Sequence, residues 1–270
     1  MHPALLVRDL RVSLRGRALI DGVSFAIDPG QRLALLGASG SGKSLTAAAL
    51  LGQLPDAMSA SGRLQINGVD VPLSNVRRRR AGITAVHQDP MSALNPLVRL
   101  GRQLEIPLRH AGHSVSMARQ LALELLASVG IEEAERTMQS FSGELSGGQL
   151  QRVCIALALA CRSSVLVADE PTTALDMVSQ AKVLDALSLY SESAHSESAH
   201  STSAGAMLFI THDLAVAAAF CHQALVLGSG RIIEAGSMES LVERPKHRYT
   251  KQLVEAAHVG TDSLRSEAAS

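Results

Sequence analysis

Aromatic residues are scarce in this chain of 270 residues. It has no tryptophan, two tyrosines and four phenylalanines, while 46% of its residues are hydrophobic. The core must therefore be aliphatic, and platforms of aromatic rings on which nucleic-acid bases stack are not expected. An excess of charge is lacking too, since 25 basic residues stand against 25 acidic ones. This balance argues against a broad nucleic-acid-binding surface, although it does not exclude a local patch.

Cysteine is also rare, with three residues at Cys154, Cys161 and Cys221. They are odd in number and follow no pattern, so they imply neither a disulfide framework nor a cysteine metal site, and we expect buried thiols. Long apolar runs are missing, because the runs at 154–161 and 214–221 are too short to span a bilayer. Residues 1–14 do not form a signal peptide. We expect a soluble cytoplasmic protein that reaches a membrane only through a partner.

One motif stands out against these absences. The chain reads G-x-x-x-x-G-K-S over residues Gly37, Ala38, Ser39, Gly40, Ser41, Gly42, Lys43 and Ser44. An apolar run, 33–36, precedes the motif, and a helix-forming run, 45–51, follows it. This order of strand, loop and helix is the context that a phosphate-binding loop requires, whereas a flexible glycine-serine turn is the alternative.

The residues of this loop suit phosphate chemistry. Its glycines let successive backbone N–H groups point inward, and the helix that begins near Lys43 adds its positive dipole end. The Lys43 ammonium reaches the β- and γ-phosphates in such loops, and a hydroxyl such as that of Ser44 is a ligand of Mg²⁺. The loop therefore predicts nucleotide binding.

Apolar patterns predict that strands alternate with helices. We expect strands at 5–7, 10–14, 23–27, 33–36, 62–68, 83–88, 165–168, 207–210 and 224–227. Helical patterns cover 45–51, much of 97–160, including 117–129, and 178–189. The predicted fold class is α/β, with a mainly parallel sheet between helices.

Two carboxylates, Asp169 and Glu170, follow the apolar strand 165–168 directly. The carboxyl ends of parallel strands are where α/β sheets hold ligands. Asp169 is a candidate partner of Mg²⁺ through bound water, and Glu170 is a candidate to polarise an attacking water. An ordinary acidic turn is the alternative, which the phosphate loop disfavours.

Several further motifs give the chain a family resemblance. Residues 145–149 read LSGGQ before the apolar helix 153–160, which by itself could be an ordinary capped helix. The sequence here resembles the ABC transporter ATPase family, whose signature is LSGGQ. Three further segments match motifs of this family, and all of the motifs stand in the family's order along the chain. They are the Q-loop-like Val86-His87-Gln88-Asp89-Pro90 before the signature, and Ala174-Leu175-Asp176 (D-loop) and Thr211-His212-Asp213 (switch histidine) after it. The resemblance covers about residues 4–258.

The resemblance implies an ABC-type P-loop ATPase domain with a RecA-like, mainly parallel core, N-terminal antiparallel strands and a helical subdomain. It predicts one domain over 1–258, with the core at 1–88 and 162–258 and the helical subdomain at about 89–161. The composition of 191–205 and of 259–270 predicts a disordered loop and a disordered tail.

The resemblance also implies site roles, with ATP and Mg²⁺ as cofactors. Such ATPases work in head-to-tail pairs, so that the signature loop of one subunit closes over ATP bound to the other. Nucleotide contacts are implied for Gly37, Ala38, Ser39, Gly40, Ser41, Gly42, Lys43, Ser44, Leu45, Ser146, Gly147, Gly148 and Gln149. Catalytic roles are implied for Glu170, His212 and Gln88, and metal binding for Ser44, Gln88 and Asp169. Without the other motifs, His212 would read as a core histidine.

Some features depart from the family or stay ambiguous. Many ABC ATPases carry an aromatic residue that stacks on adenine about 23 residues before the phosphate loop, where this chain has Leu14 followed by Arg15. We therefore expect a more weakly or less selectively held base. The four arginines at 77–80 favour a solvated helix face over a phosphate or membrane patch. The repeat in 191–205 contains two histidines, for which a solvated loop is favoured over a metal site.

The segments 88–96 and 245–253 resemble the peptide and nickel importer branch of the family. No cysteine follows Cys221 and the chain stops at 270, so it resembles the shorter nickel-import ATPase, the D-type subunit, more than the peptide subunits. We expect a nickel-importer ATPase at the cytoplasmic face of the inner membrane. Its expected partners are a second ABC ATPase in a heterodimer, two permeases and, indirectly, a solute-binding protein, without nucleic acid.

Three alternatives remain. The importer could take di- or oligopeptides or metal–chelator complexes. A non-transport ABC ATPase of repair or translation is disfavoured, since the chain has one phosphate loop and no heptad run. A degenerate cassette that binds ATP without hydrolysis is disfavoured by Glu170, His212 and the complete signature.

Overall fold

The computed structural model describes residues 2–73, 80–173, 175–192 and 204–267. The chain forms two compact units, and the second is inserted in the first. The first unit consists of 1–80 and 206–270, and the second consists of 81–205. In the described part of the chain, every helix is too short or too polar to cross a bilayer.

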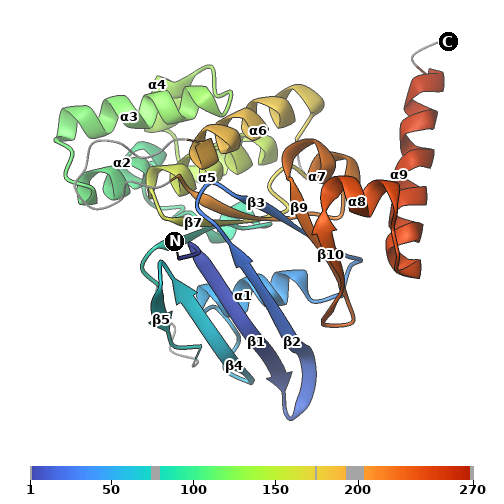
Figure 1. Cartoon of the computed structure of the whole chain (residues 1–270). Coiled ribbons are helices and arrows are strands. Elements are labelled where there is room, and N and C mark those ends of the chain that lie inside the picture. The colour runs from blue at the N-terminus through green and yellow to red at the C-terminus, as the bar shows by residue number, and fades with distance from the viewer. Residues whose placement is uncertain (1, 74–79, 174, 193–203, 268–270) are drawn as a thin grey trace. The chain divides into compact units, whose positions relative to one another are not determined.

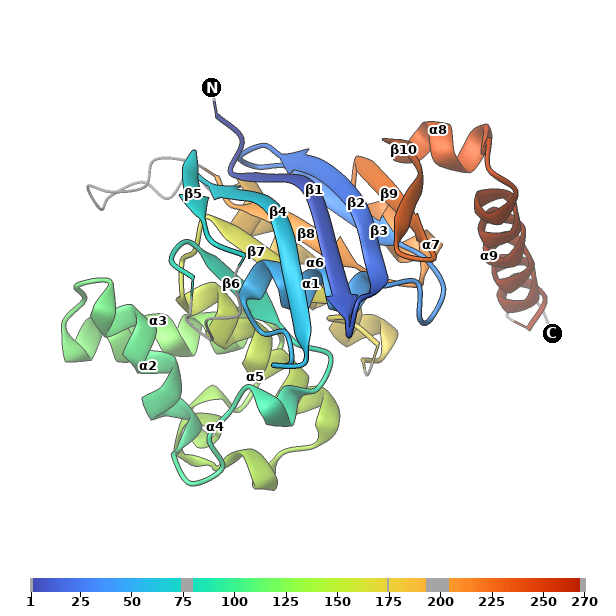
Figure 2. The same ribbon diagram turned by 90° about the horizontal axis from the view of Figure 1, so that it is seen from below.

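The first unit contains an antiparallel sheet in the order β2-β1-β4-β5, visible in Figure 2. Its strands are β1 (Leu5–Leu14), β2 (Arg17–Ile27), β4 (Met58–Ile66) and β5 (Val69–Val71). Arg15 and Gly16 both have positive φ, 49° and 82°, which suits the two-residue turn of the β1–β2 hairpin. The predicted antiparallel strands are therefore present, and β1 joins two of them into one.

A second set of strands in this unit is ordered β10-β9-β3-β8. Their bounds are β3 (Arg32–Leu36), β8 (Ala206–Ile210), β9 (Gln223–Gly228) and β10 (Arg231–Ser237). Strand β3 pairs in parallel with both β8 and β9, whereas β10 runs antiparallel to β9. Every residue of β8 is buried, which explains why an uninterrupted apolar run marks it in the sequence.

The helices of the first unit are α1 (Lys43–Leu51), α7 (Leu214–Phe220), α8 (Met238–Glu243) and α9 (Arg248–Glu267), all labelled in Figure 1. Helix α9 extends as far as Glu267, into the segment 259–270 for which the sequence predicts a disordered tail, and residues 268–270 lie outside the described residues. The Glu234 carboxylate accepts hydrogen bonds from the N–H groups of Lys246 (2.8 Å) and His247 (2.9 Å), just before α9 begins.

The second unit combines two parallel strands with helices. The strands are β6 (Ile83–Val86) and β7 (Val165–Asp169), which pair with each other. The helices are α2 (Leu100–His110), α3 (Val115–Ser128), α4 (Ala134–Gln139), α5 (Gly147–Ala160) and α6 (Met177–Glu192), with short 3-10 helices η1 (Pro90–Ser92) and η2 (Ser142–Glu144). Apolar side chains of α2, α3 and α5, among them Leu104, Ala122 and Ile155, are buried.

The unit boundaries differ in position from the domain boundaries inferred from the sequence. The predicted helical subdomain, 89–161, lies within the second unit together with β6, β7 and α6. The division into core and helical subdomain stays a prediction. Of the predicted disordered loop, residues 191 and 192 belong to α6, and 193–203 lie outside the described residues.

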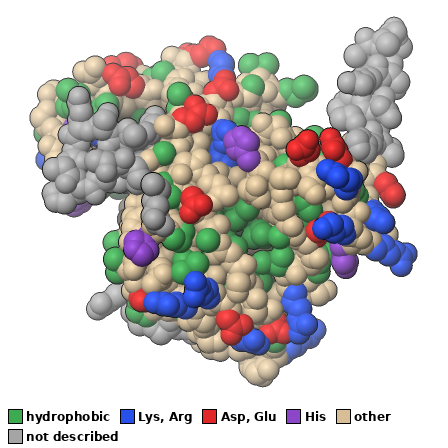
Figure 3. All heavy atoms as spheres, in the orientation of Figure 1, with side chains coloured by type: hydrophobic (Ala, Val, Ile, Leu, Met, Phe, Trp, Pro, Cys, Tyr) green, Lys and Arg blue, Asp and Glu red, His purple; other side chains and the backbone are tan. Residues whose placement is uncertain are grey.

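Charged side chains of both signs alternate on the surface, as Figure 3 shows for one face. In the first unit, the Arg11 guanidinium pairs with the carboxylates of Asp9 (2.9 Å) and Asp21 (2.5 Å). These exposed pairs agree with the balanced composition, and each contributes only about 0–1 kcal/mol to stability.

Candidate functional site

The phosphate-loop residues connect β3 to α1 in a conformation that requires glycine. Gly37 and Gly42 have φ of 155° and 109°. A Cβ atom at Gly37 would lie 2.4 Å from the backbone oxygen of Leu227, and one at Gly42 would lie 2.4 Å from Cδ1 of Ile20. The loop therefore packs closely on β2 and β9, and larger residues at these two positions would displace it.

Lys43 is buried at the start of α1, and its ammonium faces the loop. The Nζ atom donates hydrogen bonds to the backbone oxygens of Gly37 (2.7 Å) and Ala38 (3.1 Å). The Ser41 Oγ atom in the same loop is buried and makes no hydrogen bond with a described residue. A cation and an unsatisfied hydroxyl group in one glycine-rich turn fit a bound phosphate group.

His212 follows β8, the parallel neighbour of β3. Leu35 of β3 is paired with Ile210 of β8, and the Thr211 N–H donates to the Leu35 oxygen at 3.4 Å. The Asp213 carboxylate accepts hydrogen bonds from two N–H groups in the first turn of α7, so the chain turns sharply into that helix. His212 itself is exposed, at the sheet edge where β3 leads into the phosphate loop.

The second unit places Gln88, Asp169 and Glu170 at one edge of its strand pair. Val86 of β6 is paired with Ala168 of β7, so the residues that follow the two strands emerge at the same end. Asp169 and Glu170 are half-buried. The structure therefore places Gln88, Asp169 and Glu170 at the same end of this strand pair.

Glu170 has an unusual backbone conformation, with a positive φ of 49°. Its Oε2 atom accepts a hydrogen bond from the Thr173 hydroxyl at 3.0 Å. Strained backbone persists only where surrounding contacts fix it, and it gathers at functional positions. Burial lowers the pKa of nearby His87, which the charges of Asp169 and Asp89 partly oppose.

The signature residues form the N-terminal end of α5. The Ser146 Oγ atom accepts a hydrogen bond from the Gln149 N–H (3.3 Å), and the Gln149 Oε1 atom accepts one from the Ser146 N–H (3.0 Å). This reciprocal capping box leaves Ser146, Gly147 and Gln149 exposed. A Cβ atom at Gly147 would meet no atom within 4 Å, so space remains next to this turn.

The predicted site residues thus divide between the two units. The first unit holds 37–45 and His212, and the second holds Gln88, 146–149, Asp169 and Glu170. Two contacts near Glu170 were missed, those of Thr173 and Gln151. The Gln151 amide donates to the Pro171 oxygen at 3.2 Å, and no local pattern in the sequence announces a bond across 20 residues.

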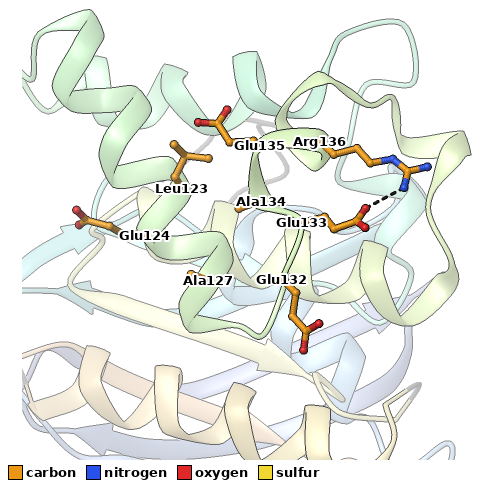
Figure 4. Close-up of a pocket in the computed structure, with 8 residues that line it drawn as sticks. All are labelled: Leu123, Glu124, Ala127, Glu132, Glu133, Ala134, Glu135 and Arg136. Atoms are coloured by element: carbon orange, nitrogen blue, oxygen red, sulfur yellow. Dashed lines mark hydrogen bonds and ion pairs between the residues drawn. The ribbon is translucent and has the colours of Figure 1, made fainter.

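The second unit also contains a pocket. The pocket lies between α3, which contributes Leu123, and the chain that enters α4, which contributes Glu132 (Figure 4). An ion pair between Arg136 and Glu133 (2.8 Å) lies at its rim. No predicted site residue lines this pocket.

Comparison with known proteins agrees with the site motifs. The family model described as ABC transporter matches residues 20–173, more than half of the chain. The peptidoglycan transport ATP-binding protein YejF of Agrobacterium fabrum is 43% identical over 96% of this chain, which spans about half (48%) of that protein. The oligopeptide transport ATP-binding protein OppD of Bacillus subtilis is 38% identical over 91% of this chain and 69% of its own length. The dipeptide transport ATP-binding protein DppD of Escherichia coli is 35% identical over 88% of this chain and 72% of its own length.

Solved structures confirm the predicted fold class. The dimeric post-hydrolysis structure of the ATP-binding cassette MJ0796, bound to ADP and Pi, has a TM-score of 0.71 and 27% identity and covers 87% of this chain and 98% of its own. An ATP binding subunit of an ABC transporter has a TM-score of 0.74 at 23% identity and covers 94% and 99%. ATP-binding proteins of this family are ATPases coupled to transport, the enzyme class predicted from the sequence. The chain belongs to the ABC transporter family.

Proposed function

We propose that this chain is the ATP-hydrolysing subunit of an ABC importer of peptides. The observation that carries the proposal is the buried Lys43 ammonium inside a glycine loop that also holds an unsatisfied Ser41 hydroxyl. This cradle suits the phosphates of ATP, and relatives named as ATP-binding proteins match 96% and 91% of this chain.

The proposed chemistry assigns one task to each group. The Lys43 ammonium and the loop N–H groups bind the β- and γ-phosphates and offset their charge. Glu170 accepts a proton from the attacking water, and the exposed His212 contacts the γ-phosphate. Ser44, Gln88 and Asp169 would hold Mg²⁺, which neutralises phosphate charge when it is bound.

The peptide substrate replaces nickel as the favoured cargo. Relatives that span nearly all of this chain are named for oligopeptide, dipeptide and peptidoglycan transport, and none of these three is named for nickel. The features that suggested nickel were the length of the chain, its cysteines and the resemblance of residues 37–51, 150–152 and 245–247, and none of these describes a substrate site. Metal–chelator complexes and nickel remain outcomes that the uptake experiment below distinguishes.

The partners follow from the same proposal. A second ATP-binding subunit completes each site with its own signature turn, for which the exposed Ser146, Gly147 and Gln149 are suited. Two permease subunits hold this chain at the inner face of the membrane, and a solute-binding protein delivers the peptide. The dimeric MJ0796 cassette provides a structural precedent for paired ATP-binding units.

Hydrolysis by the assembled transporter tests the proposed chemistry. We expect Glu170→Gln to abolish turnover while ATP binding persists, because the amide cannot accept the proton of the attacking water. Glu239→Gln, which changes an exposed glutamate of α8, is the matched control and should leave turnover unchanged. Unchanged turnover in Glu170→Gln would remove this residue from its proposed role.

Uptake by cells that lack this one gene tests the cargo. Wild type should restore import of di- and oligopeptides, and Lys43→Ala should not, because it removes the cation of the phosphate loop. If cells without the gene import peptides normally but lose nickel import, and wild type restores it, the ATPase proposal stands and the cargo is nickel.

A further inference from the structure

Gln151 makes a buried hydrogen bond next to Glu170, the proposed catalytic base of the second unit. Its side chain is 2% exposed, and its Nε2 atom donates to the backbone oxygen of Pro171 at 3.2 Å. Pro171 directly follows Glu170, so the bond joins helix α5 to the turn that carries this carboxylate. Both α5 and β7 belong to the second unit.

The same side chain has one unsatisfied atom. The Oε1 atom of Gln151 is buried and makes no hydrogen bond with a described residue. A buried amide with one unpaired end is costly, and a leucine of similar volume would avoid that cost. Packing alone therefore does not explain a glutamine at this position, whereas its bond to Pro171 does.

That bond acts on a strained turn. Glu170 has a positive φ of 49°, a conformation that a residue with a side chain adopts only under constraint. Gln151 fixes the backbone just after Glu170, and the Thr173 hydroxyl fixes the carboxylate itself at 3.0 Å. Without Gln151, the turn loses the side-chain bond that fixes the carbonyl after the carboxylate.

Helix α5 is itself anchored near its first turn. The Arg152 guanidinium donates to the Gly130 oxygen (2.6 Å) and to the Gly148 oxygen (3.3 Å). Gln151 lies two residues after Gln149, and about one helical turn after Gly147 of the signature turn. A displacement of the signature turn by a bound nucleotide would therefore move the Pro171 carbonyl as well.

We propose that Gln151 is a positioning residue, which holds the turn after β7 so that the Glu170 carboxylate faces the attacking water. This inference rests on the proposed role of Glu170 as the base. It adds that the signature helix controls that base within a single chain.

Steady-state hydrolysis by the assembled transporter tests the proposal with Gln151→Leu. Because small misplacements of a reacting group slow catalysis, we expect kcat to fall about 10- to 100-fold while KM for ATP stays within about twofold. The matched control is Tyr190→Phe, which deletes a buried bond from Tyr190 to the Ser163 oxygen (2.6 Å) away from Glu170. The control should keep its kcat, even where the lost hydrogen bond of Tyr190 lowers its melting temperature. Equal kcat in Gln151→Leu and Tyr190→Phe would overturn the proposal.

A second variant, Gln151→Glu, gives a readout that a packing role would not change. The ionised carboxylate cannot donate to the Pro171 oxygen, whereas the protonated acid can. The ratio of its kcat to that of wild type should therefore rise as the pH falls from 8 to 6, and a constant ratio would contradict the proposal. If the wild-type transporter hydrolyses no ATP, the proposed function fails. If wild type hydrolyses ATP and the Gln151 variants have the same kcat as wild type, this inference fails and the proposed function stands.

Discussion

Arg80 offers a sharp test of how the phosphate-loop helix is stabilised. The sequence predicted a solvated helix face at 77–80, of which 77–79 lie outside the described residues. For Arg80 the prediction is wrong, because its half-buried guanidinium donates to the backbone oxygens of Ala49 (2.6 Å), Leu50 and Pro72 (3.1 Å). Ala49 and Leu50 lie in the last turn of α1, where carbonyl oxygens lack helical partners.

The expected loss of stability follows from these bonds. A hydrogen bond to a charged group contributes about 1.5–3 kcal/mol, and a cation at a helix C-terminus adds about 0.3–1 kcal/mol. The three bonds share one half-buried side chain and do not add fully, so we expect Arg80→Ala to lower the free energy of unfolding by about 2–4 kcal/mol. The free energy of unfolding of Arg80→Lys should lie between those of wild type and Arg80→Ala, since one ammonium group does not reach all three oxygens.

Urea denaturation followed by circular dichroism measures this loss. The control is Arg63→Ala, which removes an exposed ion pair with Asp70 whose side chains are 52% and 60% exposed. Such pairs contribute about 0–1 kcal/mol, so the control should unfold at nearly the wild-type urea concentration. If Arg80→Ala and Arg63→Ala shift the midpoint equally, the guanidinium does not stabilise the end of α1, and the reasoning fails.

Two further predictions concern a glycine and the thiols. Gly230→Ala should lower stability by about 2 kcal/mol or more, because φ is 77° and the new Cβ atom would lie 2.0 Å from a backbone oxygen of β2. Gly236→Ala, with open space around it, is the control for the same thermal melt. Burial raises the pKa of the Cys154 and Cys221 thiols to about 12, so iodoacetamide at pH 8 should label the exposed Cys161 of the folded chain first. Labelling of all three at one rate, seen by mass spectrometry, would contradict their burial.

Much of the fold was predictable because its signals are local. The apolar runs at 165–168 and 207–210 predicted β7 and β8, since strands buried on both faces contain almost no polar residues. Strand β10 was missed because it is an edge strand of mixed exposure that shows no regular alternation. The dipeptide Ser229-Gly230 was a turn signal in the sequence that could have revealed this strand, and both residues have positive φ in the structure.

The candidate site was predictable to the extent that motifs carry it. The glycines that pack against Leu227 and Ile20 belong to a pattern whose spacing is fixed by the turn itself. The bonds of Gln151 and Arg80 were not predictable, because each joins segments 20 or more residues apart and depends on the finished packing. A run of arginines looks the same in a sequence whether its last member is solvated or caps a helix.

The insertion of one unit within the other has a consequence for synthesis on the ribosome. Leu35 of β3 pairs with Ile210 of β8, so 175 residues must be translated before that parallel ladder closes. At about 5–20 residues per second, this takes on the order of 10–40 s. Throughout that interval strand β3 lacks its neighbours β8 and β9, and only at its end has all of 81–205 been translated. In the nascent chain, both edges of the strand that precedes the phosphate loop therefore stay unpaired until late in translation. We expect chaperones to bind this exposed apolar strand during that period.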